Sequence, residues 1–410
     1  MLSDSPAYGE GETIRVKSSS ITSEFPEGFR IKLEAAGENE ITSIAVRLKI
    51  GQQTRGAYDY LCQGGGHREP TDWRCNDLEA GKDVNAELFW RTGTSAQFIP
   101  PGTLIKYNFE IEDSGGTRLD TEQEQFIYHD PRFEWSEVSD GTTSVAYHGP
   151  VKTRAEKILD AIRQTLDTMG PLLGADTDEP IRVTTYNNPK EMLEALPPRS
   201  VTIGRELFTE GQAFTELGTL LVYGGGRMAL GTASHEVTHI LVHRAGDGIF
   251  RRVPAWLNEG LAEYGNIDPG FSYDIALEFA VATGSLLPVV YMDVLPGNPE
   301  EVIIFYGESR SIVRLMISEF GANKMARLMA TLKNGKKLND ALQEVYGFDK
   351  QGLDDLWRDR IGAARYIPPE AGAERPTPLP RRAILPYSLT PQPDAEAVVS
   401  KSDEPTPTSM

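Results

Sequence analysis

The pattern with the clearest chemistry in this sequence is His235-Glu236-Val237-Thr238-His239. Residues 229–245 around it are predicted to form a helix, in which positions four apart lie on one face, one turn above the other. Two imidazoles in that arrangement can bind one Zn²⁺ ion. Glu236 can then accept a proton from a water that the ion activates. The pattern therefore predicts a zinc site with its own general base.

A catalytic zinc site needs a third protein ligand and one position left for water. The best candidate is Glu259, twenty positions after His239 in the segment P-A-W-L-N-E-G-L-A-E-Y at 254–264. Its first residue, Pro254, suits the first turn of a helix. The turn signal at 246–248, Gly-Asp-Gly, lets this second helix fold back across the first. We expect His235, His239 and Glu259 to bind the ion.

His243 lies four positions after His239 but is not expected to be a ligand. Three histidines on one straight helix cannot share an ion, because the outer two are about 12 Å apart along the axis. His243 is instead predicted to be a residue near the helix C-terminus, favoured by the helix dipole. The metzincin class of zinc peptidases is excluded as well, because its motif requires glycine and histidine at the positions where this chain has Val242 and Ala245.

The two motifs together, H-E-x-x-H followed by W-L-N-E-G-L-A, resemble the gluzincin metallopeptidases. The nearest match is the peptidase MA-like group, and the similarity to M1 aminopeptidases and thermolysin-like enzymes is more distant. The resemblance implies that His235, His239 and Glu259 bind zinc and that Glu236 is the general base. The M1 motif G-x-M-E-N is absent, so the resemblance does not extend to aminopeptidase specificity.

The resemblance implies three further roles. Glu263, one turn beyond Glu259, would support a zinc histidine through its other N–H; the alternative is an exposed helix carboxylate. Tyr306 would stabilise the oxyanion; the alternative is a tyrosine packed in a helix interface. The strand expected at 219–223, ahead of the motif helix, would be an edge strand that binds the substrate backbone.

Hydrophobic periodicity indicates a multidomain chain. After a flexible N-terminus at 1–20, residues 21–148 alternate apolar and polar positions in short strands, typical of an antiparallel β-sandwich of immunoglobulin-like architecture. Residues 150–366 predict an α+β zincin-type metallopeptidase domain, with short strands at 181–185, 201–203 and 219–223 and a mostly helical C-terminal half. Residues 367–410 are rich in Pro, Ser and Thr and are predicted to be a disordered tail.

Charge and hydrophobicity limit the classes of binding partner that the protein is expected to have. The formal net charge of −19 over 410 residues argues against a nucleic-acid partner, which would need clustered Lys and Arg. The sequence contains no run of 18 apolar residues, so no membrane-spanning helix is predicted. Among six histidines, His67, His129 and His148 lie outside any ligand spacing and are expected to be surface or structural residues. Oligomeric state is left open.

The two cysteines bear on localisation. Cys62 and Cys75 could close a disulfide or remain free thiols. A disulfide would suit an extracytoplasmic or cell-surface location, although the N-terminus lacks the pattern of a signal peptide. The function predicted is a one-zinc metallopeptidase acting on peptide or protein substrates. The alternative is a zinc-containing binding or scaffold protein without activity.

Overall fold

The computed structural model describes residues 13–63, 78–93, 97–197, 210–247, 253–270 and 272–368. All described helices and strands belong to one unit that ends at Tyr366. The strand predicted at 201–203, the cysteine at 75 and, beyond residue 368, the tail predicted at 367–410 lie outside the described residues.

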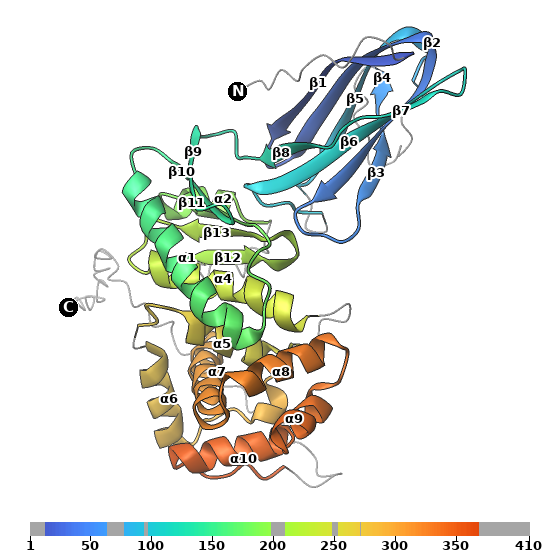
Figure 1. Ribbon diagram of the computed structural model, residues 1–410. Helices are drawn as coiled ribbons and strands as arrows, with labels where there is room; N and C mark the ends of the chain where they lie inside the picture. Colours follow the sequence, from blue (N-terminus) through green and yellow to red (C-terminus); the bar gives the residue numbers. More distant parts are fainter. Residues whose placement is uncertain are drawn as a thin grey trace, which may run out of the picture. The chain divides into compact units, whose positions relative to one another are not determined.

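The N-terminal part is an antiparallel β-region, as predicted (Figure 1). Its strands are β1 (Ile14–Glu24), β2 (Gly28–Ile50), β3 (Ala57–Tyr60), β4 (Cys62–Gln63), β5 (Gly81–Arg91), β6 (Thr103–Asp113), β7 (Arg118–Asp120) and β8 (Glu124–Tyr128). All eight are hydrogen-bonded into one sheet through the long strand β2. The more specific immunoglobulin-like sandwich stays a prediction.

Strand β2 corrects one expectation within this region. The sequence predicts a turn at 37–40 between two strands, but β2 continues through it with a register shift between Ala36 and Ile41. Its first half pairs with β1 and β5, and its second half pairs with β3 and β6. The chain does not reverse because both halves keep the alternation of apolar residues that buries one face. Strand β1 also begins at Ile14, inside the range 1–20 expected to be flexible.

The second part is built on a five-stranded mixed sheet. Its strands are β9 (Trp135–Ser139), β10 (Thr143–His148), β11 (Ile181–Tyr186), β12 (Gly211–Phe214) and β13 (Thr219–Tyr223), in the order β12-β13-β11-β10-β9. The β10–β11 and β11–β13 pairs are parallel, whereas β9 and β12 pair antiparallel with their neighbours. This sheet therefore starts at Trp135, not after residue 148, because β10 pairs with β11 instead of with the N-terminal strands.

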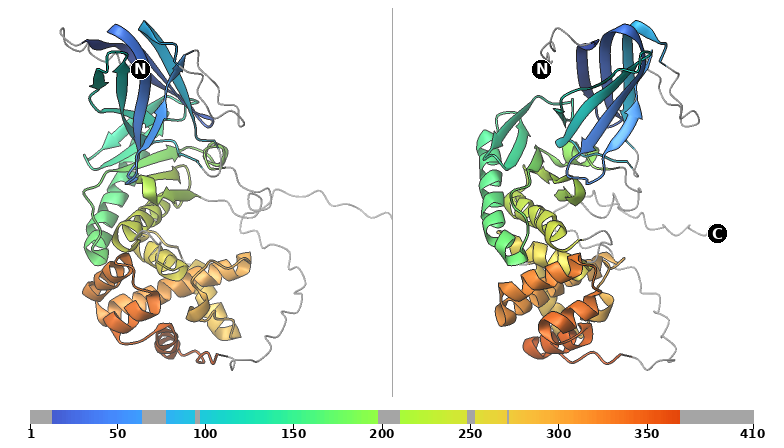
Figure 2. Two further views of the ribbon diagram at one scale, coloured as in Figure 1. Left: turned by 90° about the vertical axis from the view of Figure 1, so that its right-hand side faces the viewer. Right: turned by 45° about the vertical axis from the view of Figure 1, so that its right-hand side comes forward.

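Alternation along the strands divides the faces of this sheet. In β13, Leu220 and Val222 join the core under the helices, whereas Leu221 joins the core of the β-region. Helices α1 (Lys152–Leu173) and α4 (Ala229–Gly246) lie side by side on the first face (Figures 1 and 2). The short α2 (Pro189–Glu194) contributes the buried Met192 to the core on the other face.

The C-terminal half is helical, as predicted. Its helices are α5 (Ala255–Gly265), α6 (Ser272–Thr283), α7 (Pro299–Phe320), α8 (Ala322–Lys333), α9 (Leu338–Tyr346) and α10 (Lys350–Ile361). Helix α7 starts at Pro299, because the Asn298 side chain accepts a hydrogen bond from the Glu300 N–H at 3.1 Å and proline suits the first turn of a helix. None of the described helices has the length and apolar character needed to span a bilayer.

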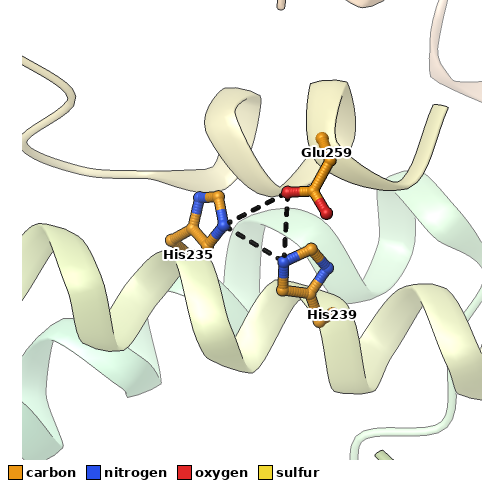
Figure 3. A group of neighbouring side chains, drawn as sticks. All are labelled: His235, His239 and Glu259. Carbon is orange, nitrogen blue, oxygen red and sulfur yellow. Dashed lines mark hydrogen bonds and ion pairs between the residues drawn. The ribbon is translucent and has the colours of Figure 1, made fainter. Parts of the chain in front are cut away.

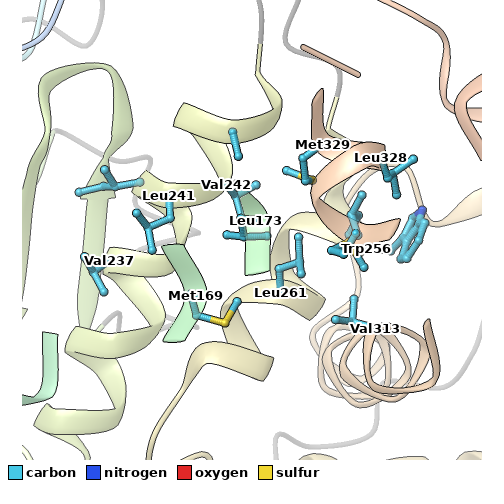
Figure 4. Packing of buried hydrophobic residues seen from close by; sticks show 14 of the residues in the cluster. Met169, Leu173, Val237, Leu241, Val242, Trp256, Leu261, Val313, Leu328 and Met329 are labelled. Carbon is cyan, nitrogen blue, oxygen red and sulfur yellow. The ribbon is translucent and has the colours of Figure 1, made fainter. Parts of the chain in front are cut away.

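One apolar core joins these helices to the sheet (Figure 4). Helix α1 contributes Met169 and Leu173, and α4 contributes Val237 and Leu241. Trp256 of α5 is fully buried between them and the C-terminal helices. Because protein interiors are close-packed, this core fixes how α4 and α5 lie against each other. That relation positions the predicted site.

Candidate metal centre

Helix α4 presents its two motif histidines on one side. Val237, Ile240 and Leu241 are fully buried in the core, whereas His235 and His239 are half-buried on the opposite side of the helix. This division follows from the helical period of 3.6 residues, because the apolar positions fall on one face and the histidines on another. The sequence therefore fixes the direction in which both imidazoles point.

Small residues bring α5 close to its neighbours. A Cβ atom at Gly260 would lie 2.4 Å from the Ser309 carbonyl oxygen of α7, and one at Gly265 would lie 2.3 Å from Oγ1 of Thr238 on α4. Glycine lets α5 approach the backbone of α7 at the first point and the Thr238 side chain of α4 at the second. The approach places Glu259, which lies next to Gly260, over the histidines of α4.

The three predicted ligands converge (Figure 3). The two Nε2 atoms of His235 and His239 are 3.1 Å apart, and Oε2 of Glu259 lies 3.6 Å and 3.5 Å from them. Ligand atoms at 2.0–2.1 Å from a tetrahedral ion are about 3.3–3.4 Å apart. Oε2 of Glu259 is also buried without a hydrogen-bond partner. The residues present thus fit a Zn²⁺ ion, and within the described ranges they are the one group of three that could hold a metal.

Each histidine is oriented through its other ring nitrogen. Nδ1 of His235 lies 2.9 Å from Oε1 of Glu263, and Nδ1 of His239 lies 3.0 Å from Oδ1 of Asn258. An acceptor at Nδ1 favours the tautomer that keeps its proton there, which leaves the lone pair of Nε2 for a metal. Glu263 is therefore a buried partner of a ligand and not an exposed helix carboxylate.

The charges of the site favour a cation. Burial alone would raise the pKa of Glu259, but His239, His235 and the Tyr306 hydroxyl hold the pKa of that carboxyl below its ordinary value. Burial opposes a charge on His235, yet the neighbouring carboxylates of Glu259 and Glu263 raise its pKa to about 10. The carboxylates thus stabilise positive charge at these imidazoles, and a metal ion binding there must displace a proton.

Tyr306 lies beside the ligand carboxylate. Its hydroxyl helps to hold the pKa of Glu259 low, and its ring centroid lies 6.4 Å from that of His235. Burial, and next the charge of Glu259, raise the pKa of Tyr306 far above its usual range, so its hydroxyl stays protonated as a hydrogen-bond donor. Its ring stacks on Tyr273 of α6 at 5.4 Å. Both expected readings of Tyr306 are thus compatible with its position, since it packs between helices and also faces the site.

Strand β12 lies next to the general-base candidate. A Cβ atom at Gly211 would lie 2.5 Å from Cγ2 of Thr232 and 2.7 Å from Cγ of Glu236, so any larger residue here would force these two side chains to shift. The strand expected to be the edge, 219–223, is β13, and it is an inner strand between β11 and β12. Among the described strands, the one at the edge of the sheet near the site is therefore β12. Periodicity did not predict β12 because it has only four residues, with a glycine at its start.

The remaining described histidines are outside the centre. His243 is in the last turn of α4, as predicted, and its Nδ1 lies 3.3 Å from Oδ2 of Asp247. His148 is stacked 4.0 Å from Phe133 and lies 3.1 Å from the Glu191 carboxylate. Both contacts stabilise the structure. His67 lies outside the described residues.

Sequence reasoning missed two groups. Asn258, which contacts Nδ1 of His239, stands directly before Glu259 in the W-L-N-E-G segment. Its position next to a predicted ligand was the one signal in the sequence that could have pointed to it. Glu308 of α7 is fully buried, and burial raises its pKa to about 8, while its Oε1 accepts a hydrogen bond from the Leu287 N–H at 2.8 Å. No spacing rule indicates such a residue, because its partner is a loop backbone.

Comparisons with known proteins agree with this centre. Residues 161–363 match the family model of the peptidase MA superfamily, a range that contains every ligand candidate. No curated protein was found to match the chain. Solved structures show only weak similarity. A bromine derivative of BhCBM56 is 11% identical over 30% of this chain and 97% of that chain, with a TM-score of 0.18. The GAE domain of GGA2p from Saccharomyces cerevisiae is 10% identical over 30% and 94%, with a TM-score of 0.13. Scores this low carry no argument about the fold.

Proposed function

Residues 161–363 belong to the peptidase MA superfamily, and from this premise we propose that the protein is a zinc-dependent metallopeptidase that hydrolyses peptide bonds. The observation that carries the proposal is the convergence of His235, His239 and Glu259, with ligand atoms 3.1–3.6 Å apart beside Glu236. One Zn²⁺ ion held by these three side chains would lower the pKa of a water toward 7 and polarise the substrate carbonyl.

The chain's own residues would supply the proton transfers. Glu236 would accept a proton from the attacking water and pass it to the leaving amine as the C–N bond breaks. Tyr306 would donate a hydrogen bond to the oxygen that becomes negative, since its hydroxyl remains protonated. Glu263 and Asn258 would hold the two imidazoles in place. The edge strand β12 would bind the substrate backbone as an added strand.

The test uses purified full-length protein. Zinc is measured by elemental analysis, and hydrolysis is measured on an unstructured protein substrate for wild type and Glu236→Gln. We expect one zinc per chain in both proteins and a loss of activity of about 10²–10⁴-fold in the variant. Equal activity in the two proteins would contradict the role of Glu236. Stoichiometric zinc with no hydrolysis by wild type would favour the alternative, a non-catalytic zinc-containing binding or scaffold protein.

We further propose an extracytoplasmic location. Cys62 is disulfide-bonded, and the sequence contains one other cysteine, Cys75. Structural disulfides persist in oxidising compartments and are rare in the cytosol. Trapping free thiols in acid-quenched cells, before any lysis, tests this. Alkylation of Cys62 without prior reduction would contradict it.

A further inference from the structure

A cavity of about 500 Å³ lies where the β-region meets the second sheet. The β-region contributes Trp90, Phe98 and Ile99 to its walls, and the chain around β12 contributes Ala213, Phe214 and Leu217. Cavities of roughly 300–1,000 Å³ are the usual size for ligand sites, and they occur preferentially where two structural units meet. The cavity is therefore large enough to hold one or two side chains of a bound polypeptide.

The same short strand connects this cavity to the metal centre. Gly211, the first residue of β12, lies against Glu236, and Ala213 and Phe214 at its other end line the cavity. A strand rises about 3.3 Å per residue, so the cavity begins about 7–10 Å from Gly211. In the sheet order of the described strands β12 is terminal. A polypeptide extended along it from the scissile bond would reach the cavity with a side chain two to four residues away.

The residues that line the cavity indicate which kind of substrate side chain it would bind. The rings of Phe98 and Phe214 pack against each other in the cavity wall, with centroids 5.6 Å apart and planes tilted by 34°. Ile99 and Leu217 behind them are buried. Eight of the twelve lining residues are apolar, and the polar ones are Gln53, Gln97, Thr215 and Glu216. An apolar or aromatic side chain gains free energy by leaving water for the apolar part of this surface.

We propose that this cavity is a substrate subsite of the peptidase, and that it selects a polypeptide with an apolar or aromatic side chain two to four residues from the scissile bond. The inference rests on the proposed function. It assigns the N-terminal β-region a direct part in recognition, because seven of the twelve lining residues, among them Trp90, Phe98 and Ile99, come from that region. Cleavage is therefore expected to depend on residues well outside 161–363.

The test uses zinc-loaded full-length protein and internally quenched peptides of ten residues around one cleavable bond. Phenylalanine or serine is placed in turn at each position from four residues before to four residues after that bond. We expect one position two to four residues away at which phenylalanine raises kcat/KM about tenfold over serine. The same comparison is made with Phe98→Ser, which removes a cavity wall, and with Ala57→Trp, which fills the cavity from β3. Phe89→Ser on β5, outside the cavity lining, is the matched control.

The outcomes separate the two proposals. The subsite is supported if the phenylalanine preference falls to about twofold or less in Phe98→Ser and Ala57→Trp but persists in Phe89→Ser. A wild-type enzyme without that preference, or a preference unaffected by both cavity variants, overturns the subsite while the peptidase stands. Absence of cleavage of every peptide overturns the peptidase instead. Binding of the phenylalanine and serine peptides to Glu236→Gln, followed by fluorescence anisotropy, gives the same selectivity without turnover.

Discussion

Nδ1 of His235 lies 2.9 Å from Oε1 of Glu263, and Nε2 of the same ring lies 3.6 Å from Oε2 of Glu259. One turn of α5 therefore carries both a predicted metal ligand, Glu259, and a hydrogen-bond acceptor for a predicted histidine ligand. A carboxylate that accepts the Nδ1–H of a ligating histidine orients the ring and makes Nε2 a better donor to a metal. The spacing of four residues between Glu259 and Glu263 is what brings both to one face.

Substituting Glu263 should weaken zinc binding. We expect zinc affinity to fall about tenfold for Glu263→Gln, which keeps an acceptor but loses the charge, and nearer to 100-fold for Glu263→Ala. Competition against a fluorescent chelator measures both. Glu278→Gln, on an exposed position of α6, is the control and should bind zinc as wild type does. Unchanged affinity in Glu263→Ala would mean that the carboxylate only stabilises the fold.

Removing the Tyr306 hydroxyl should slow catalysis without releasing zinc. The loss of one donor to a developing oxyanion typically costs about 10²–10³-fold in kcat, so we expect a decrease of that order for Tyr306→Phe with KM little changed. Tyr264→Phe, at an exposed position on α5, removes the same atom away from the site and should have no effect. A decrease in bound zinc that parallels the loss of activity would instead show that the hydroxyl acts through Glu259.

The ligand set could be predicted because it is encoded locally. His235 and His239 share a helix face because they are four residues apart, and the W-L-N-E-G segment predicts a second helix that carries a carboxylate. What could not be predicted is set by contacts between distant segments. Gly211 next to Glu236 depends on how β12 pairs with β13, and a four-residue strand carries too little periodicity to reveal that pairing.

The boundary between the two sheets also depends on contacts between distant segments, whereas the helices can be predicted from local spacing. The helical character of the C-terminal half could be predicted because apolar residues recur at helical spacing in several of its segments, as in α8 and α9. Strands β9 and β10 were assigned to the first domain because a strand's alternation does not say which sheet it joins. Only the parallel pairing of Val145 with Val183 settles that they belong to the second sheet.

Gly260 should be intolerant of a side chain. In Gly260→Ala the new Cβ atom would meet the Ser309 carbonyl oxygen at 2.4 Å and Cγ2 of Val313 at 2.7 Å. The carbonyl belongs to α7 and cannot rotate away, so overpacking should outweigh the better helix propensity of alanine. We expect a loss of roughly 1–2 kcal/mol in the free energy of unfolding, measured with urea. Gly297→Ala, where no atom lies within 4 Å, should stay within about 0.5 kcal/mol of wild type.

His129 should make the stability of the protein depend on pH. Burial, and next the charge of Arg182, lower its pKa to about 4 from an ordinary value of 6.5, while Glu137 opposes the shift. The unfolded chain therefore takes up a proton on this imidazole at a higher pH than the folded protein does. The contribution of His129 to the free energy of unfolding is therefore largest above pH 6.5 and is lost as the pH falls toward 4. With 1.36 kcal/mol per pKa unit, the loss between pH 6.5 and 5 is about 2 kcal/mol.

Replacing the imidazole isolates this contribution. The ring of His129 stacks on Trp135 with centroids 5.9 Å apart, and its Nδ1 is buried without a hydrogen-bond partner. His129→Phe keeps the stacking and removes the titrating group, so it should cost little at pH 7. Urea unfolding of both proteins at pH 7, 6 and 5 compares their slopes, and the contribution of any other titrating group cancels in the difference. We expect the variant to lose about 2 kcal/mol less than wild type between pH 6.5 and 5. Equal slopes would show that His129 is protonated in the folded protein as readily as in the unfolded chain.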